Sequence, residues 1–280
     1  MDIYHRISFN GDAYPKIREF IERLGIHYKT APFPHRPPGT GLVYFDIYES
    51  NPVWPELSKA LQKWPMLDRF DTIFDEEEIL AASWLRLVPV KESGYLKPDT
   101  PKWRTLLYEG YCKGCGAYDQ QKSPVQMSRE PKRPKNSFVS PIGPYVLMCS
   151  PEMEESIRAA GIRGYEVWPV LRYRKGEPFE HTVQLYMPHV ARPGLTRTEG
   201  LSSSRCGVCG RVKYQPHMRG VMYFKREAFV ETQDLDMFHS FEWFGSGHAA
   251  YREIIISNHF ARLILEKGWK GVRMKVIEFV

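Results

Sequence analysis

The chain has 280 residues, of which 42% are hydrophobic and 26% are charged, a composition typical of globular proteins rather than disordered or fibrous ones. No segment approaches the roughly 18 consecutive apolar residues that span a bilayer, and the first residues alternate in polarity instead of forming a signal sequence. We therefore expect a soluble, cytoplasmic protein with no membrane partner. The net charge of +6 is modest for this length.

The first hundred residues contain no cysteine and alternate between strand-like and helix-like segments. Strands are predicted at Ile3–Phe9 and Leu42–Tyr48, and the apolar spacing of Pro15–Leu24 predicts a helix that ends at a glycine. Asn51 followed by proline predicts the start of a second helix, and the acidic run Asp75–Glu78 predicts a third helix start, because acidic side chains stabilise a helix N-terminus. We expect an N-terminal α+β domain over residues 1–100.

Two copies of one cysteine motif follow, Cys112-Lys-Gly-Cys115-Gly and Cys206-Gly-Val-Cys209-Gly. Two cysteines separated by two residues can bring both sulfurs onto one metal ion, and the glycine that follows lets backbone amides approach the sulfurs closely. Zinc accepts four thiolates in a tetrahedron at about 2.3 Å, which leaves no position for a substrate. The motifs therefore predict one structural zinc site whose ligands are Cys112, Cys115, Cys206 and Cys209.

The spacing of the cysteines leaves alternatives open. Many more residues separate Cys115 from Cys206 than the roughly 15 to 20 of a compact zinc ribbon, so a shared site requires the intervening segment to be a folded insertion. Separate metal sites are an alternative, with His217 as a further ligand after Cys209. A thioredoxin-like redox pair would place one motif at a helix start, whereas both motifs lie among glycines. Cys149 lies in an apolar run and is expected to be buried rather than a ligand.

Basic residues gather in the segment Gln120–Asn136, among three prolines. Cations can neutralise phosphates and give sequence-independent affinity for nucleic acid. A solvated connecting loop is the interpretation we prefer, and a nucleic-acid-binding arm is the alternative. The basic residues concerned are Lys122, Arg129, Lys132, Arg133 and Lys135.

Two stretches, at about residues 145–170 and 252–277, align with each other without a gap. In both, an apolar strand ends at a serine, a short amphipathic helix follows, and two glycines precede another strand. Ser150 and Ser257 are therefore expected to be helix N-caps and not nucleophiles. Because each copy follows one CxxCG motif, we expect two related strand–helix–strand modules that share a metal site. Chance recurrence of a common strand–helix–strand pattern is the alternative.

A segment rich in aromatic residues and glycine lies before the second copy. Aromatic side chains in an irregular segment are effective anchors for a protein partner, although core packing is their more common role. The candidate partner-binding residues are Phe241, Trp243, Phe244 and His248.

With CxxCG occurring twice, each time before a strand, helix, Gly-x-x-Gly and strand, the chain resembles the double-CXXCG motif proteins over about residues 105–280. Members of that family occur as immunity proteins of bacterial polymorphic toxin systems. The segments Phe241–Gly245 and Gly268–Val272 are also similar to the carboxyl-terminal pattern of other immunity-type families. The resemblance implies a protein that binds and neutralises a cognate toxin, with the metal holding the scaffold.

The sequence as a whole predicts an α+β fold in which residues 101–280 form a double-CxxCG zinc-binding domain with an internal repeat. The expected function is a cytoplasmic protein-binding factor, in the form of an immunity protein. The sequence lacks the short motifs of phosphate loops, metalloproteases and serine hydrolases, which favours binding over catalysis. A zinc-containing nucleic-acid-binding protein is one alternative. An enzyme with scattered acid and base residues, such as Asp234, Asp236 and His239, is another.

Overall fold

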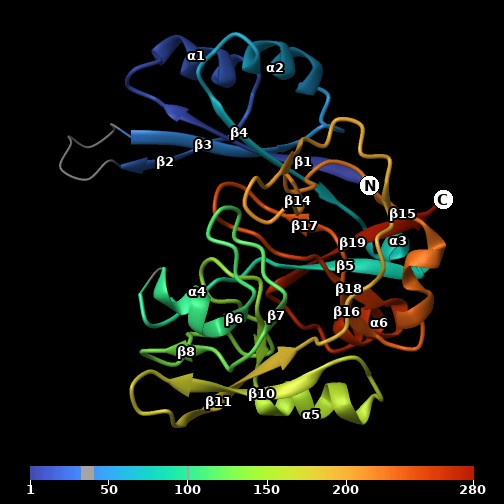
Figure 1. Ribbon diagram of the computed structural model, residues 1–280. Coiled ribbons are helices and arrows are strands. Elements are labelled where there is room, and N and C mark those ends of the chain that lie inside the picture. The colour runs from blue at the N-terminus through green and yellow to red at the C-terminus, as the bar shows by residue number, and fades with distance from the viewer. Residues whose placement is uncertain (33–40, 100) are drawn as a thin grey trace. The chain divides into compact units, whose positions relative to one another are not determined.

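The computed structural model has a mixed α+β fold, as the sequence predicts, and its elements are shown in Figure 1. The described residues are 1–32, 41–99 and 101–280. They divide into two units, of which the first contains residues 1–75 and 218–220 and the second contains residues 76–217 and 221–280.

The boundary between the units differs from the one expected at residue 100. Strand β5 (Trp84–Pro89) is a central strand of the largest sheet of the second unit, so the chain leaves the first unit before this strand. Helix α3 (Glu76–Ala81) precedes β5 and has three glutamates in its first turn, as the acidic run predicts.

The first unit is a four-stranded antiparallel sheet with two helices on one face (Figure 1). Alternating side chains of β1 and β3 are buried against Ile17, Ile21 and Leu57 of the helices. The predicted first helix is present and ends at Gly25, whose φ is +68°. The second helix begins three residues later than Asn51, which instead accepts a hydrogen bond from the backbone N–H of Val53. In sheet order, the strands are β2 (Lys29–Pro32), β3 (Gly41–Tyr48), β1 (Asp2–Asn10) and β4 (Leu67–Ile73), and the helices are α1 (Pro15–Arg23) and α2 (Trp54–Leu61).

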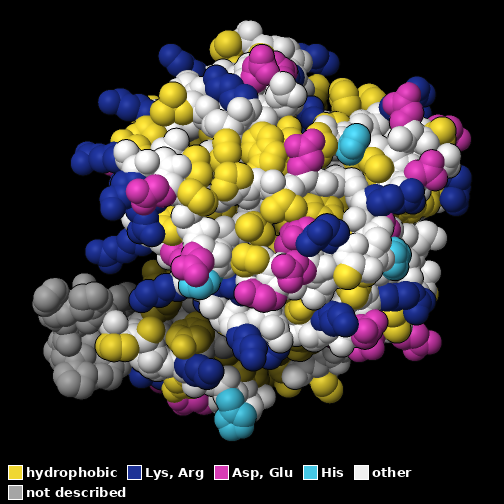
Figure 2. All heavy atoms as spheres, turned by 90° about the horizontal axis from the view of Figure 1, so that it is seen from below, with side chains coloured by type: hydrophobic (Ala, Val, Ile, Leu, Met, Phe, Trp, Pro, Cys, Tyr) yellow, Lys and Arg dark blue, Asp and Glu magenta, His cyan; other side chains and the backbone are white. Residues whose placement is uncertain are grey.

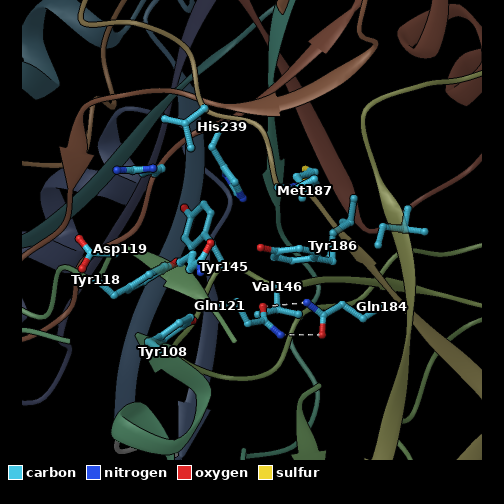
Figure 3. Close-up of a pocket in the computed structure, with 16 residues that line it drawn as sticks. Tyr108, Tyr118, Asp119, Gln121, Tyr145, Val146, Gln184, Tyr186, Met187 and His239 are labelled. Atoms are coloured by element: carbon cyan, nitrogen blue, oxygen red, sulfur yellow. Dashed lines mark hydrogen bonds between the residues drawn. The ribbon is translucent and has the colours of Figure 1, made fainter. Parts of the chain in front are cut away.

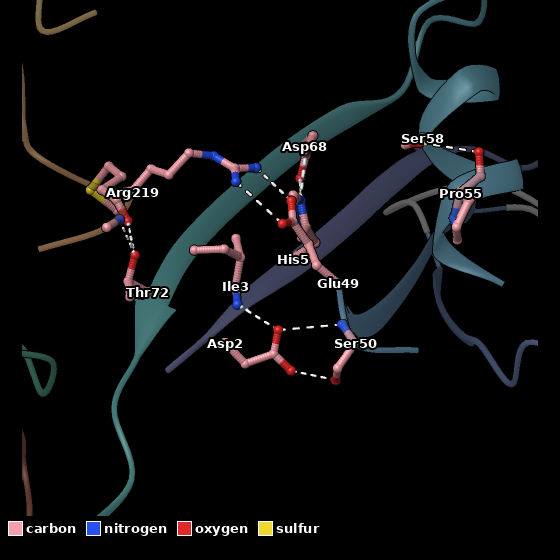
Figure 4. A network of polar contacts seen from close by, with 12 residues as sticks. Asp2, Ile3, His5, Glu49, Ser50, Pro55, Ser58, Asp68, Thr72 and Arg219 are labelled. Atoms are coloured by element: carbon pink, nitrogen blue, oxygen red, sulfur yellow. Dashed lines mark hydrogen bonds and ion pairs between the residues drawn. The ribbon is translucent and has the colours of Figure 1, made fainter. Parts of the chain in front are cut away.

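A polar network holds the short segment Met218–Gly220 to this sheet (Figure 4). Arg219 donates two hydrogen bonds to the carboxylate of Glu49, and Glu49 also lies 3.1 Å from Nε2 of His5. The other ring nitrogen of His5 lies 2.9 Å from Asp68, and the His5 side chain is buried. The Arg219 hydrogen bonds hold the pKa of Glu49 below its usual range, so this carboxylate remains charged in the folded protein.

The described residues of the second unit form two larger and two smaller sheets. The four-stranded sheet has the order β8 (Gln126–Met127), β10 (Glu166–Arg172), β11 (Pro178–Tyr186) and β9 (Leu147–Cys149). The six-stranded sheet has the order β12 (Leu195–Thr196), β15 (Met222–Phe224), β19 (Val272–Phe279), β5, β18 (Ile254–Ser257) and β16 (Met237–His239). The smaller sheets consist of β13 (Ser203–Arg205), β14 (Val212–Tyr214) and β17 (Trp243–Phe244), and of β6 (Tyr108–Glu109) and β7 (Gln120–Gln121). The helices are α4 (Lys102–Leu107), α5 (Pro151–Ala159), α6 (Asn258–Glu266) and the 3₁₀ helix η1 (Arg226–Thr232).

Both repeated stretches of the sequence have the same local structure. The first is the strand–helix–strand segment β9–α5–β10, and the second is β18–α6–β19. The side chains of Ser150 and Ser257 accept hydrogen bonds from the backbone N–H three residues later, at 3.3 and 3.2 Å, which confirms both as N-caps. Gly161 and Gly268 end the helices with positive φ, a conformation that glycine adopts without a steric penalty.

The central strand of each segment's sheet comes from a different part of the chain. Strand β11 lies between β9 and β10, and β5 lies between β18 and β19, in all cases antiparallel. The registers correspond: Val183 pairs with Cys149 in one sheet, and Leu85 pairs with Ile256, the aligned residue, in the other. The central strand of the first segment, β11, thus follows that segment in the chain, and the central strand of the second segment, β5, precedes both segments.

The turns after the two helices also correspond. A Cβ on Gly164 would lie 2.2 Å from the backbone oxygen of Met237, and a Cβ on Gly271 would lie 2.1 Å from that of Phe138. Met237 belongs to β16, which pairs with β18, and Phe138 precedes Val139, which pairs with Met148 of β9. The second glycine of each segment therefore packs against the strand that pairs with the other segment.

Candidate metal centre

The two CxxCG motifs form turns with the same backbone hydrogen bonds. In the first, the N–H of Cys112 donates to Ala117 O at 2.8 Å, and the N–H of Gly116 donates back to Cys112 O at 2.8 Å. In the second, Cys206 donates to Arg211 O and Gly210 donates to Cys206 O, both at 2.9 Å. The first turn lies between the short strands β6 and β7, and the second lies between β13 and β14. Each turn thereby directs its two cysteine side chains to one side.

The final glycine of each motif has a different degree of constraint. Gly116 and Gly210 have φ of +84° and +72°, a region that residues with a Cβ rarely adopt. A Cβ on Gly116 would also lie 2.2 Å from the backbone oxygen of His248, whereas a Cβ on Gly210 would meet no atom within 4 Å. The first turn is therefore enclosed by the segment around His248, and the second turn is open.

The four motif cysteines come together in one cluster, with all their sulfur atoms within 4.8 Å of one another. Sγ of Cys112 lies 3.8 Å from that of Cys206, and Sγ of Cys115 lies 3.6 Å from that of Cys209. In a tetrahedral site with metal–sulfur bonds of about 2.3 Å, the sulfur atoms lie about 3.8 Å apart. The cysteines are therefore positioned to bind a single metal ion, with two ligands from each turn.

The other residues considered as ligands lie elsewhere. Nδ1 of His217 lies 3.2 Å from Arg86, and His217 is not part of the cysteine cluster. Cys149 is fully buried in β9 and is not part of the cluster either. Burial raises the pKa of Cys149 to about 12, so this thiol stays protonated and unreactive.

The environment of the cluster is asymmetric. Cys112 and Cys115 are buried, Cys206 is half-buried and Cys209 is exposed. The backbone amides of Cys209 and Val208 lower the pKa of Cys206 to about 6, whereas burial raises the pKa of Cys115 to about 12. Thiolates bind metal ions, so the second turn presents its first sulfur already in the ligating form.

A buried lysine connects the two turns. Nζ of Lys213, on β14 directly after the second turn, donates to Cys115 O at 2.9 Å, Gly247 O at 2.6 Å and Ala249 O at 3.1 Å. All three protons of the ammonium group are thereby satisfied by carbonyl oxygens. His248 adds a contact of 3.1 Å between Nδ1 and Lys113 O. The only signal for Lys213 in the sequence is its place in a strand after the motif, which does not predict this role.

The candidate partner-binding residues divide into two pairs. Phe241 is 45% exposed and His248 is also exposed. Trp243 and Phe244 are 4% and 0% exposed, and they pack in the core with Tyr118 and Tyr251. The expectation that these two rings contact a partner is therefore corrected, because β17 pairs with β14 and turns both rings into the interior.

A cavity lies next to Tyr118, a residue that also packs against Cys112 and Cys115 (Figure 3). Tyr145, Tyr186 and His239 surround it, and Gln121 and Gln184 join their side-chain amides by two hydrogen bonds of 3.0 and 2.8 Å at its edge. Burial, and secondarily Arg252, lowers the pKa of His239 to about 4. Nδ1 of His239 has no hydrogen-bond partner among the described residues. The cavity volume is about 40 Å³, which is room for about three water molecules.

The residues suggested for an enzyme do not converge on one site. Asp236 accepts hydrogen bonds from Arg163 N at 2.9 Å and from Ser257 Oγ at 2.5 Å. It therefore connects the turn of the first strand–helix–strand segment to the N-cap of the second. His239 faces the cavity instead, and Asp234 is exposed at the surface.

The basic segment Gln120–Asn136 is only partly a solvated loop. Val125 and Met127 are buried in the core, whereas the four side chains Lys122, Arg129, Lys132 and Lys135 are exposed. On the face shown in Figure 2, Lys and Arg side chains are intermingled with Asp and Glu. No described helix has the length and apolar character needed to cross a membrane.

No family model matches the sequence, and no curated protein matches it.

Proposed function

We propose that this protein is a cytoplasmic binding protein in which a structural zinc ion joins two related modules, and that it acts as an immunity protein against a cognate bacterial toxin. The observation that carries the proposal is the closed set of four cysteine sulfurs. Four thiolates complete the coordination of zinc and leave no position for a substrate. Five cysteines without a disulfide among them also fit a reducing compartment.

The paired geometry supports two related modules. The CxxCG turns have the same hydrogen bonds, the helices have the same serine caps, and the central strands have corresponding registers. Two ligands from each turn would place the zinc ion between the modules. Because metal binding is coupled to folding, the ion would hold the modules together rather than take part in a reaction.

The immunity role follows from the resemblance to the double-CXXCG motif proteins over about residues 105–280. The cavity lined by His239 has room for about three water molecules and does not itself admit a substrate. The exposed aromatic side chain of Phe241 offers the kind of surface anchor that protein interfaces use.

The test is affinity capture of the tagged chain from its native cells, with nuclease treatment and moderate salt, followed by mass spectrometry. We expect one stoichiometric protein partner. When that partner is produced alone in a host cell, we expect growth to stop, and when both proteins are produced together, we expect growth to continue. Cys149→Ala, which removes a thiol outside the cluster, is the matched control and should capture the same partner.

Two results would contradict the proposal. If partners appear only when nuclease is omitted, the nucleic-acid alternative replaces it, and the exposed lysines of the basic segment become the residues to mutate. If the captured partner is harmless to the host, the chain is a binding protein but not an immunity protein.

A further inference from the structure

A surface groove of about 650 Å³ lies next to the second CxxCG turn. Residues of strand β14, the end of the turn and the segment around Gly194 line it. The groove is lined by cationic side chains together with apolar and aromatic ones. We call this surface the basic groove. The side chains that carry the argument are Arg205, Tyr214, Lys225, Phe241, Glu242 and Arg252.

Three of the four cations of the basic groove form no ion pair with a described carboxylate. Arg211 forms an ion pair with Asp119, but no carboxylate among the described residues pairs with Arg205, Lys225 or Arg252. The guanidinium of Arg252 lies 4.6 Å from the centroid of the Trp243 ring, and its Nε is buried with no acceptor in the described part of the chain. Lys225 is exposed. The groove therefore has a surplus of positive charge that a ligand's carboxylates would complement.

The groove also has an apolar component. Phe241 is 45% exposed, and Tyr214 is half-buried, and both line the groove. A simple anion would leave these rings in water. A ligand with an apolar or aromatic side chain beside its acidic groups would cover them, and such side chains are the usual anchors of interfaces.

A buried carboxylate distinguishes a peptide from a nucleic acid. Oε1 of Glu242 accepts hydrogen bonds from the backbone N–H of Gly194 and Leu195 at 2.7 and 2.9 Å. Oε2 is buried and accepts no hydrogen bond from the described residues. The negative charge of Glu242 opposes a nucleic acid, which carries a phosphate at every nucleotide, more than a peptide whose carboxylates are spaced apart from it.

We propose that the basic groove binds an acidic segment of a partner protein. The carboxylates of the segment would pair with Arg205, Lys225 and Arg252, and a neighbouring apolar side chain would pack on Phe241 and Tyr214. This inference rests on the proposed protein-binding function and names the surface that performs it.

The first experiment selects short random peptides displayed on phage against the full-length protein. We expect enriched peptides to carry Asp or Glu beside Phe, Tyr, Trp or Leu. Labelled synthetic copies should bind the wild type and bind Lys225→Glu at least about tenfold more weakly, because a surface cation becomes an anion. Lys175→Glu makes the same charge change at another exposed lysine and should leave the affinity unchanged.

The inference is overturned if no peptide is enriched, if the enriched peptides are not acidic, or if Lys225→Glu binds them as tightly as the wild type does. It is also overturned if single-stranded oligothymidylate binds the wild type more tightly than the peptides and displaces them. Arg252→Gln provides a second measurement within the groove, provided that its unfolding transition matches that of the wild type.

Affinity capture separates this inference from the proposed function. If wild type and Lys225→Glu capture the same protein to the same extent, the protein-binding function stands and the basic groove is not its site. If neither captures a protein, the proposed function itself fails. Loss of the partner only in Lys225→Glu, with Lys175→Glu unaffected, supports both.

Discussion

Individual residues of the two cysteine turns have unequal roles although the motifs are the same. Gly116 and Gly210 share a positive φ, but only Gly116 lies against another segment of the chain, at the backbone oxygen of His248. Lys213 and His248 make further contacts on the same side of the cluster. The first turn is thus fixed by the protein around it, and the second turn is fixed mainly by its own hydrogen bonds.

The two glycines therefore predict different mutational effects. Gly210→Ala should lower the free energy of unfolding by about 1–2 kcal/mol, the usual cost of a left-handed conformation for an L-residue. Gly116→Ala should lower it by about 3 kcal/mol or more, because its Cβ also overlaps a backbone atom that cannot move aside easily. Urea titrations of both metal-loaded variants measure the difference. Equal losses of unfolding free energy in the two variants would show that the segment around His248 moves aside without destabilising the protein.

His239 predicts a dependence of stability on pH. Its pKa falls from 6.5 to about 4 in the folded protein because the ring is buried. The unfolded chain therefore binds a proton below about pH 6.5 that the folded chain binds only below about pH 4. Stability should fall over this window as the pH decreases, by on the order of 3 kcal/mol in total.

The comparison of wild type with His239→Gln isolates this effect, since acid also weakens metal binding by protonating thiolates. Urea titrations of both proteins from neutral pH down to about pH 4 provide the measurement. The stability difference between them should shift in favour of the variant as the pH decreases. A difference that is constant across the range would contradict the role of His239.

At the scale of single elements, the sequence predicted the helix starts, helix ends and caps that depend only on residues close together in the chain. The first helix with its terminal glycine, the acidic start of α3 and the two serine caps are local signals, and each is present in the structure. The paired CxxCG turns were equally visible, since a cysteine pair with a following glycine defines the turn by itself. The four cysteines of the candidate metal site were therefore predictable from the sequence alone.

The remaining features depend on contacts between distant residues. Nothing in Trp84–Pro89 indicates that its partners are β18 and β19, so the sequence did not predict this strand. The domain boundary was therefore expected at residue 100, whereas the first segment of the first unit ends at residue 75. The burial of Trp243 and Phe244 was not predicted for the same reason, because a ring in a glycine-rich segment is buried only if a distant strand covers it. Arg252 has no local signal at all, and only the position of Trp243 in space reveals it.

The two helix caps allow a matched test at this scale. Ser150→Ala should lower the free energy of unfolding by about 1 kcal/mol, the typical value for an N-cap. Ser257→Ala should lower it by about 2 kcal/mol, because Ser257 Oγ also donates to the buried carboxylate of Asp236. Ser203→Ala, on an exposed strand, is the control and should change it by less than about 0.5 kcal/mol. Equal losses in the two caps would mean that the bond to Asp236 contributes nothing.

At the scale of the whole molecule, the candidate metal centre brings together segments that are distant in sequence. Cys112 and Cys206 are 94 residues apart, and their turns connect strands of two different small sheets. A metal ion between them would restrain the second unit much as a covalent crosslink does. The first unit has its own hydrophobic core and contains no cysteine.

Loss of the clustered cysteines should therefore act on the second unit. Cys112→Ser and Cys206→Ser should each reduce zinc content, and we expect the free energy of unfolding to fall by on the order of 3 kcal/mol or more. Metal analysis by mass spectrometry and urea titration measure the two effects together. Cys149→Ala should retain its zinc. Wild-type protein without zinc and serine variants with normal stability would contradict the metal centre.

The exchange of central strands has a consequence for how such a chain can be divided. Strand β5 precedes the first strand–helix–strand segment but completes the sheet of the second, and β11 follows the first segment and completes its sheet. If β11 is counted as the opening strand of the second half, as β5 is of the first, each half gives its opening strand to the other. One half produced alone would then lack a central strand and two metal ligands, and it would recover both only by pairing with another copy as an intertwined homodimer, with the metal ion on the symmetry axis.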